Sequence, residues 1–321
     1  MLYLSKADME AVFTMRDAFD AVREAFSIYT AGRAQVPLRS SVDIATREAQ
    51  VLFMPAFADD AVGVKVVGFY PSNAAIGKPV TPATMFLFDE TTGELACVMD
   101  GTYLTQLRTA AAAGLATELL ATPGARVAAL IGLGGQAPCQ LEALFQAAPG
   151  LEEVRLFDLD ATRRTAFTEK YKREGVHLLP VNSADEAVSG AQLITTVTTA
   201  TAPVFSFDAL DKGVHVNAIG SYTHEMQELP EELVASCDLL VFDTVHGVMS
   251  ESGDILKPLE KGLLAGKNLE IEMGHVIAGT HKRNAASDIT VYKGVGSGVM
   301  DVVTAAALFK KACAAGVGTS I

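Results

Sequence analysis

Hydrophobic residues near the start of the chain recur with the spacing of one helical face. Between Met15 and Tyr29 they follow the i, i+3, i+4, i+7 pattern, and Gly32 follows where a helix cap would lie. Short β-rich runs come next, over residues 36–44, 51–57, 62–69, 84–88 and 94–99. We predict a helix, then a mostly antiparallel sheet, and then an alanine-rich helix over 102–121.

From residue 123 onward, apolar runs alternate with stretches of helical pattern. The runs cover residues 127–131, 154–157, 193–197, 214–219 and 239–242. This alternation is typical of a parallel sheet with crossover helices. A further strand-like run begins at Ile289 and leads to a final helix that begins near Ser297. The chain is therefore predicted to be an α/β protein with two differently built parts.

The composition is that of a globular protein, with 321 residues of which 50% are hydrophobic and 20% charged. At roughly 150 residues per domain, this length suggests two domains. The net charge of −13 and the lack of any Lys/Arg run argue against nucleic-acid binding. The chain has no basic leader and no apolar run of about 18 residues, so we expect no membrane association and a cytoplasmic location.

The spacing of cysteines and histidines does not indicate a metal site. The four cysteines are too far apart for a CxxC pattern, and the six histidines show no paired ligand spacing. We therefore expect reduced cysteines and no bound metal.

The segment RVAALIGLGGQAPCQLEAL has the form of a dinucleotide-binding fingerprint, with a buried strand before the glycines and an amphipathic helix after them. Gly132 would permit the tight turn, and Gly134 would let a pyrophosphate approach the backbone. Ala137 would keep the helix close to the strand. This context favours a nucleotide site over a turn that is merely tight.

Asp158 ends the next predicted strand, EVRLFD. Its carboxylate would accept hydrogen bonds from an adenosine ribose and would repel a 2′-phosphate, so NAD(H) is favoured over NADP(H). Two alternatives stay open. Asp158 caps the following helix, or Arg163 and Arg164 turn toward a phosphate.

Lys65 lies within the apolar run AVGVKVVGF, where strand alternation calls for a residue suited to burial. Either its ammonium group reaches solvent from a strand edge, or it binds a substrate carboxylate or transfers protons with a lowered pKa. Arg39 and Arg108 are either ordinary surface residues or, together with Lys65, the donors for a planar carboxylate.

Several segments, in the right order, resemble the ornithine cyclodeaminase/mu-crystallin family over nearly the whole chain. They are GVKVVGFYPSN, TGELACVMDGTYLTQLRTAAAAGLA, IGLGGQAPCQ, VNAIGSYTHEMQELP and SDITVYKGVGSGVMDV. The resemblance implies a Rossmann NAD(P)-binding domain over 123–299. It also implies an α+β domain for substrate binding and dimerisation, formed by 1–122 together with 300–321, and hence a homodimer.

Segment matching assigns roles to individual residues. Arg39, Lys65 and Arg108 would bind the carboxylate of a small amino or imino acid, and Val295 would line the substrate side. With the glycine motif included, the expected cofactor contacts are Arg108, Gly132, Gly134, Gly135, Gln136, Ala137, Asp158, Thr198, Asn217 and Gly220.

One departure from the family bears on the reaction. Where cyclodeaminases have an Asp followed by a Pro-Gly-Lys run, this chain has Tyr222, with Met226 in place of the Lys. A neutral phenol is poorly suited to a cationic amine, and His224 or Glu225, shifted along the chain, would point elsewhere. We therefore expect Lys65 and Tyr222 to be the catalytic residues of an NAD(P)H-dependent imino-acid reductase or amino-acid dehydrogenase.

The expected substrate is a small imine, either cyclic Δ1-pyrroline-2-carboxylate, which would give L-proline, or an open-chain 2-imino acid. A first alternative is an L-ornithine cyclodeaminase that uses catalytic NAD and releases ammonia. A second is a non-catalytic, mu-crystallin-like protein that binds NAD(P)H or another small ligand.

Overall fold

The computed structural model describes the whole chain, residues 1–321, apart from the side chain of Ala74. The chain divides into two compact units, one made of 1–111 and 297–321 and the other of 112–296. The first boundary lies inside helix α3 (Gly101–Leu120), not after it as the sequence suggested. One continuous helix therefore contributes residues to both units.

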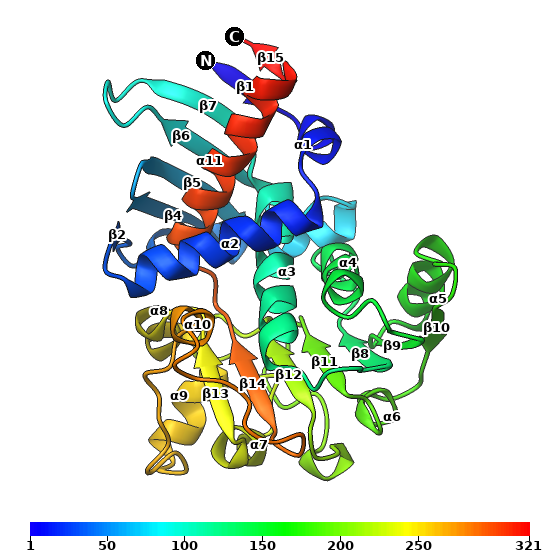
Figure 1. Ribbon diagram of the computed structural model, residues 1–321. Helices are drawn as coiled ribbons and strands as arrows, with labels where there is room; N and C mark the ends of the chain where they lie inside the picture. Colours follow the sequence, from blue (N-terminus) through cyan, green and yellow to red (C-terminus); the bar gives the residue numbers. More distant parts are fainter. The chain divides into compact units, whose positions relative to one another are not determined.

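The first unit is built on an eight-stranded sheet with the order β15-β1-β7-β6-β5-β4-β2, in which β3 also pairs with β4 (Figure 1). Its strands are β1 (Leu2–Leu4), β2 (Ala34–Gln35), β3 (Ser40–Ile44), β4 (Ala49–Ala58), β5 (Ala61–Phe69), β6 (Ala83–Phe88), β7 (Leu95–Asp100) and β15 (Thr319–Ser320). The pairs from β3 to β7 are all antiparallel, and this confirms the predicted meander.

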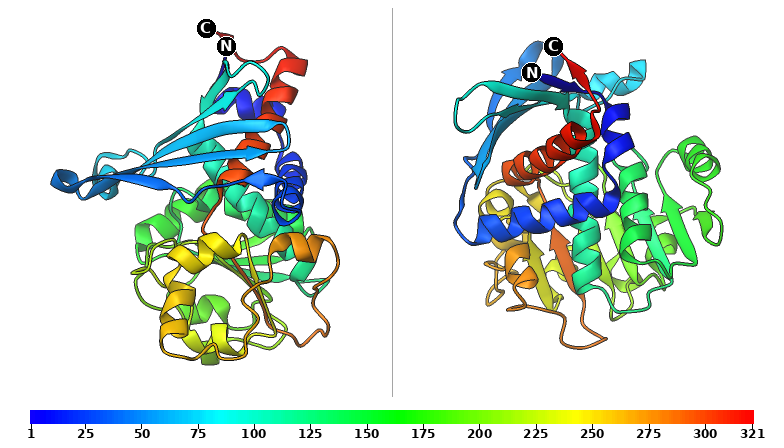
Figure 2. Two further views of the ribbon diagram at one scale, coloured as in Figure 1. Left: turned by 90° about the vertical axis from the view of Figure 1, so that its left-hand side faces the viewer. Right: turned by 45° about the horizontal axis from the view of Figure 1, so that its top comes forward.

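Helices α2 and α11 pack against each other, and α11 also contacts strands β4, β5 and β6 (Figure 2). The helices of this unit are α1 (Lys6–Val12), α2 (Met15–Thr30) and α11 (Gly298–Ala315), with 3₁₀ turns η1 (Ala45–Arg47) and η2 (Pro71–Ile76). A capping box formed by Thr14 and Asp17 begins α2, and Gly32 follows it with a φ of +72°. The predicted first helix is thus confirmed. The short helix α1 was not expected.

The second unit contains a seven-stranded parallel sheet with the order β10-β9-β8-β11-β12-β14-β13. Its strands are β8 (Val127–Ile131), β9 (Glu153–Phe157), β10 (His177–Pro180), β11 (Leu193–Thr196), β12 (His215–Ala218), β13 (Leu239–Phe242) and β14 (Thr290–Lys293). All the predicted strands are present, and β10 is an addition. The order reverses beside β8, so the sheet has the switch point at which doubly wound folds bind dinucleotides.

Both faces of this sheet are buried. Leu130 and Leu156 face a cluster that includes Leu144 of α4, whereas Ile131 and Val216 face a second cluster. The helices of the unit are α4 (Ala137–Ala147), α5 (Ala161–Lys170), α6 (Ala184–Val188), α7 (Glu231–Ser236), α8 (Val245–Glu251), α9 (Gly253–Glu260) and α10 (Met273–Ile277), with the 3₁₀ turn η3 (Phe207–Ala209). Burial on both faces explains the continuous apolar runs of the strands, and the α/β prediction is confirmed.

Candidate functional site

Lys65 lies on the buried face of β5, because burial alternates along this strand and Lys65 falls on an inward position. Its side chain is only 1% exposed, and Nζ is 2.8 Å from Oδ2 of Asp301. This burial rules out the interpretation in which the ammonium group reaches solvent. A buried ammonium needs a partner, and Asp301 is that partner.

Asp301 joins Lys65 to Arg108. The carboxylate is fully buried near the N-terminus of α11, and its Oδ1 accepts a hydrogen bond of 2.8 Å from Nε of Arg108 on α3. Arg108 is itself 4% exposed, so it is not an ordinary surface arginine. No other hydrogen bond of its guanidinium is found among the described residues, and Nη1 and Nη2 can therefore serve a further acceptor.

The pKa of Lys65 is lowered from its usual 10.5 to about 7. Burial is the largest cause, the positive charge of Arg108 adds to it, and Asp301 opposes both. The half-buried Arg39 lowers the pKa further, which puts it within electrostatic reach of Lys65. Burial raises the pKa of Asp301, yet Arg108 and Lys65 outweigh it and hold that pKa below its usual value.

Two basic side chains thus contact one buried carboxylate, and a third, Arg39, acts on Lys65 through its charge. When Lys65 is protonated, the cluster carries a surplus of positive charge, which favours an anionic ligand such as a second carboxylate. Sequence reasoning found the three cations and missed Asp301. A signal was available, because Asp301 is an acidic residue inside the otherwise apolar segment GVMDVVTAAAL.

The glycine motif forms the turn between β8 and α4. Gly132 has a φ of +93°, and a Cβ there would lie 2.6 Å from the carbonyl oxygen of Val197, so only glycine fits. Gly134 and Gly135 are exposed, and a Cβ at Gly134 would meet no atom within 4 Å. Ala137 is buried at the start of α4. The loop therefore presents open backbone and a helix N-terminus, as a pyrophosphate requires.

Gln136 lies in the same loop, and its side-chain oxygen is buried with no hydrogen-bond partner among the described residues. An unpaired buried acceptor is costly unless a ligand supplies a donor. Ribose hydroxyls and a carboxamide are such donors, so this loop fits a nicotinamide dinucleotide.

Asp158 follows β9, and its carboxylate is tied to the glycine loop. The backbone N–H of Leu133 donates to Oδ2 at 2.9 Å, and that of Asp160 donates to Oδ1 at 2.9 Å. Arg163 forms an ion pair with it at 3.1 Å. The cap of α5 is Asp160, so the interpretation of Asp158 as a helix cap is wrong. Arg164 donates to the backbone oxygen of Asp158.

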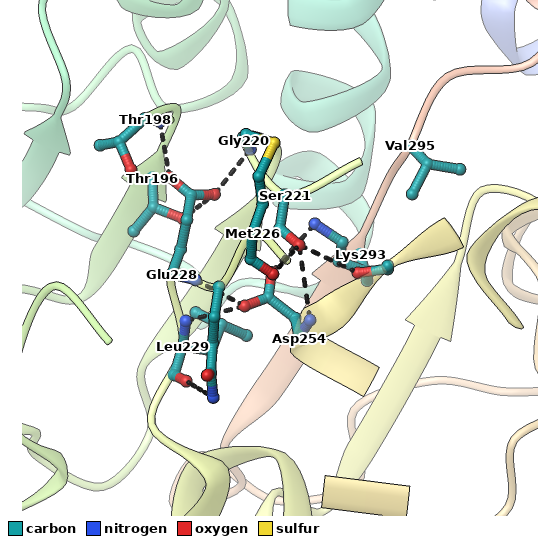
Figure 3. Close-up of polar contacts among 12 residues, drawn as sticks. Thr196, Thr198, Gly220, Ser221, Met226, Glu228, Leu229, Asp254, Lys293 and Val295 are labelled. Atoms are coloured by element: carbon teal, nitrogen blue, oxygen red, sulfur yellow. Dashed lines mark hydrogen bonds and ion pairs between the residues drawn. The ribbon is translucent and has the colours of Figure 1, made fainter. Parts of the chain in front are cut away.

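The ends of β11 and β12 carry three more of the expected cofactor contacts. Thr198 and Gly220 each donate a backbone hydrogen bond of 2.6 Å to Glu228, as Figure 3 shows. Asn217 differs, because its buried side chain is bonded to Thr117 and lies 3.1 Å from a ring nitrogen of His215. In this arrangement its side chain is not available to a cofactor.

Val295 and Tyr222 both pack on the same apolar cluster of the second unit. The backbone of Val295 is fixed by Asp243, whose Oδ2 accepts hydrogen bonds from Val295 N at 3.0 Å and from Gly296 N at 2.7 Å. Tyr222 is half-buried. Besides Asp301, sequence reasoning missed the buried polar residues Asp243, Glu228, Asp254 and Lys293.

Two further features bear on function. Among the described residues, no group of three or more His, Cys, Asp or Glu side chains is arranged to hold a metal ion. No helix in the described part of the chain is both long and apolar enough to cross a membrane.

Comparison with known sequences points to one family. A sequence model described as the ornithine cyclodeaminase/mu-crystallin family matches residues 1–316. A Delta(1)-pyrroline-2-carboxylate reductase from Bacillus cereus is 35% identical over 325 residues, which cover 100% of this chain and 99% of the relative.

Two solved structures are similar to this one along the full chain. A Delta(1)-pyrroline-2-carboxylate reductase from Thermococcus litoralis, in complex with NADH and L-proline, has a TM-score of 0.95 and 34% identity, with 100% of each chain covered. An archaeal alanine dehydrogenase dimer with bound NAD has a TM-score of 0.92 and 31% identity, with coverage of 100% of this chain and 98% of that chain.

The buried cluster predicts the effect of removing its carboxylate. Asp301→Asn should lower the free energy of unfolding by about 3–5 kcal/mol, because it leaves two buried cations without a counter-charge. Chemical denaturation measures this loss. Asp60→Asn is the matched control, since the Asp60–Lys310 pair is exposed and should contribute little. Equal stability of the two variants would contradict the assignment of Asp301.

Proposed function

Because the chain belongs to the ornithine cyclodeaminase/mu-crystallin family, we propose that it is an NAD(P)H-dependent imino-acid reductase. Its preferred substrate is a small cyclic imine, Δ1-pyrroline-2-carboxylate, which it reduces to L-proline. The observation that carries this proposal is the buried cluster of Lys65, Asp301 and Arg108, which combines a carboxylate-binding surplus of positive charge with a proton donor.

Arg108 and Arg39 bind the substrate carboxylate. The bond from Nε of Arg108 to Asp301 fixes the plane of the guanidinium and leaves its two terminal nitrogens for a bidentate contact. Arg39 and Lys65 add positive charge on the same side. This anchoring fixes the position of the imine carbon next to the carboxylate.

Reduction of an imine adds a hydride to carbon and a proton to nitrogen, and it leaves an amine. The nicotinamide, when bound, supplies the hydride. Lys65 supplies the proton, since a pKa of about 7 makes its ammonium a better acid than an ordinary lysine while it is still largely protonated below neutral pH. Tyr222 shapes the substrate side or donates a proton.

The second unit holds the cofactor. Gly134, Gly135 and the first N–H groups of α4 receive the pyrophosphate, and Asp158 receives the adenosine ribose. We propose that NAD(H) is preferred. Two backbone N–H groups hold the carboxylate of Asp158, which is 10% exposed, and its negative charge would repel a 2′-phosphate. Arg163 could attract a 2′-phosphate, but it is already paired with Asp158.

Cyclodeamination is disfavoured by the loop after β12. A cyclodeaminase needs a carboxylate to handle the second amine of its substrate, and position 222 carries a tyrosine. Glu225 is exposed, and Glu228 is buried with both oxygens bonded to the ends of β11 and β12. Glu228 is therefore not free to replace the missing group.

The protein is proposed to form a homodimer through the outer face of the first unit's sheet. This face is apolar on three neighbouring strands, with Phe53 and Phe57 on β4 exposed by 37% and 38%. The half-buried Val64 of β5 is paired with Pro55 of β4 on one side and with Phe86 of β6 on the other. An apolar sheet face of this kind is typical of obligate interfaces.

The direct test of the reaction is NADH oxidation in the presence of Δ1-pyrroline-2-carboxylate. Rapid, saturable oxidation with formation of L-proline is expected. NADH oxidation that occurs only with 2-keto acids and ammonia would indicate that the substrate is an open-chain imine. Release of ammonia from L-ornithine without net NADH change would support a cyclodeaminase, and NADH binding without any turnover would support a ligand-binding protein.

The role of Lys65 predicts a pH profile. Because the protonated form is required, kcat/KM should be level at low pH and fall about tenfold per pH unit as the pH rises above about 7. Lys65→Met should abolish turnover and leave NADH affinity unchanged. Lys310→Met, an exposed lysine of the same unit, is the control. Retained turnover in Lys65→Met would remove Lys65 from catalysis.

Asp158 predicts the cofactor preference. Asp158→Ser should lower the affinity for NADH relative to NADPH by about tenfold or more, the size expected for a lost hydrogen bond to a charged group. Equilibrium binding of both cofactors measures the ratio. Asp160→Asn keeps the helix cap and serves as the control. An unchanged ratio in Asp158→Ser would exclude Asp158 from the ribose site.

The proposed dimer predicts that Phe86→Lys yields a monomer, since a charge at the centre of an apolar interface costs several kcal/mol to bury. Analytical ultracentrifugation distinguishes the two states. Leu263→Lys adds the same charge at an exposed apolar residue of the second unit and should leave the mass unchanged. A dimeric Phe86→Lys protein would place the interface elsewhere.

A further inference from the structure

The carboxyl edge of the parallel sheet is held together by side chains that the proposed reaction does not use. In a doubly wound sheet the dinucleotide lies along this edge, with its pyrophosphate at the loop after the first strand, here β8. Because Asp158 follows β9 and is the proposed ribose contact, the adenosine half of the dinucleotide lies on the β9 side. The nicotinamide half then extends the other way, toward the ends of β11 and β12. This step rests on the cofactor proposed above.

Glu228 connects those two strand ends. It is fully buried, and its Oε1 accepts a hydrogen bond of 2.6 Å from the backbone N–H of Thr198, just beyond β11. Its Oε2 accepts from the backbone N–H of Gly220, just beyond β12, at 2.6 Å, and from the Thr196 hydroxyl at 3.0 Å. Figure 3 shows the carboxylate facing all three donors.

The two strand ends approach as closely as the backbone permits. A Cβ on Gly220 would lie 2.1 Å from the carbonyl oxygen of Thr198 and 2.6 Å from Oε1 of Glu228. Any side chain at residue 220 would therefore push the two segments apart. The carboxylate and the glycine together fix the spacing of Thr198 and Gly220.

Glu228 is in turn held by a buried ion pair. The backbone N–H groups of Glu228 and Leu229 donate to Oδ1 of Asp254 at 2.7 and 2.9 Å. Oδ2 of Asp254 is 3.0 Å from Nζ of Lys293, at the end of β14, and both side chains are fully buried (Figure 3). The network therefore runs from β14 through Asp254 and Glu228 to the ends of β11 and β12.

We propose that Glu228 is a positioning residue for the nicotinamide half of the cofactor, which acts by fixing the backbone of Thr198 and Gly220. A carboxylate suits this task because it only accepts, so both oxygens face N–H donors. An amide has one accepting oxygen, and its NH2 group would face at least one of the two backbone N–H groups. The role is thus specific to an acid at this position.

The test compares NADH with ADP-ribose, which keeps the adenosine and the pyrophosphate but lacks the nicotinamide. Glu228→Gln should weaken NADH binding about tenfold or more, since it leaves a buried donor without its acceptor. It should change ADP-ribose affinity less than about twofold, because Asp158 follows β9, and the exposed Gly134 of the loop after β8 has no atom of β11 or β12 within 4 Å of its Cβ position. A general loss of folding would weaken both ligands equally.

A milder variant covers the case in which Glu228→Gln fails to fold. Thr196→Val removes only the hydroxyl donor and should weaken NADH binding roughly twofold to fivefold, again without loss of ADP-ribose binding. Asp238→Asn is the matched control. Its carboxylate accepts a backbone hydrogen bond of 2.7 Å from Ile289 at the amino edge of the same sheet, and the variant should leave the ratio of the two affinities unchanged.

The outcomes separate this inference from the proposed function. A wild-type protein that binds neither NADH nor ADP-ribose would overturn the dinucleotide site and this inference with it. A wild-type protein that binds both, with an unchanged ratio in Glu228→Gln and Thr196→Val, would overturn the role of Glu228 alone. Selective loss of NADH affinity in both variants, but not in Asp238→Asn, is the result expected.

Discussion

The structure depends on three buried carboxylates, those of Asp301, Glu228 and Asp254. A buried carboxylate is stable only where other groups donate to it, so it draws together segments that are distant in the chain. Asp301 does this for Lys65 and Arg108 in the first unit. In the second unit Glu228 and Asp254 do it for three strand ends.

Local patterns in the sequence predicted the elements well. The parallel strands of the second unit are short apolar runs buried on both faces, and the glycine loop has a distinctive spacing, so both could be found without tertiary information. Helix α1 was missed because seven residues are too few to display a helical period. Strand β10, at the edge of the sheet, was missed because its sequence HLLP has only two apolar residues between a histidine and a proline. The first unit's meander was evident from turn sequences such as DETTG.

The sequence singled out individual residues only where a side chain is unusual for its segment. Lys65 stood out because a lysine breaks an apolar strand, but its partner Asp301 is 236 positions away, and no local pattern links them. Asn217 shows what segment matching leaves out. It was assigned to the cofactor by its match to the family, whereas its buried side chain is hydrogen-bonded to Thr117 and lies beside His215. Thr117 comes from another part of the chain, and no local pattern indicates this contact.

In the proposed reaction, the same electrostatics would link substrate binding to proton supply. In the free protein the pKa of Lys65 is lowered by burial and by Arg108, and only Asp301 opposes them. A bound carboxylate would bring a second negative charge into the cluster, and a nearby negative charge raises the pKa of an ammonium group. Lys65 would therefore be more fully protonated with the imino acid present than without it. If Lys65 is the proton donor, binding of the imino acid would therefore favour the protonation state that reduction of the imino acid requires.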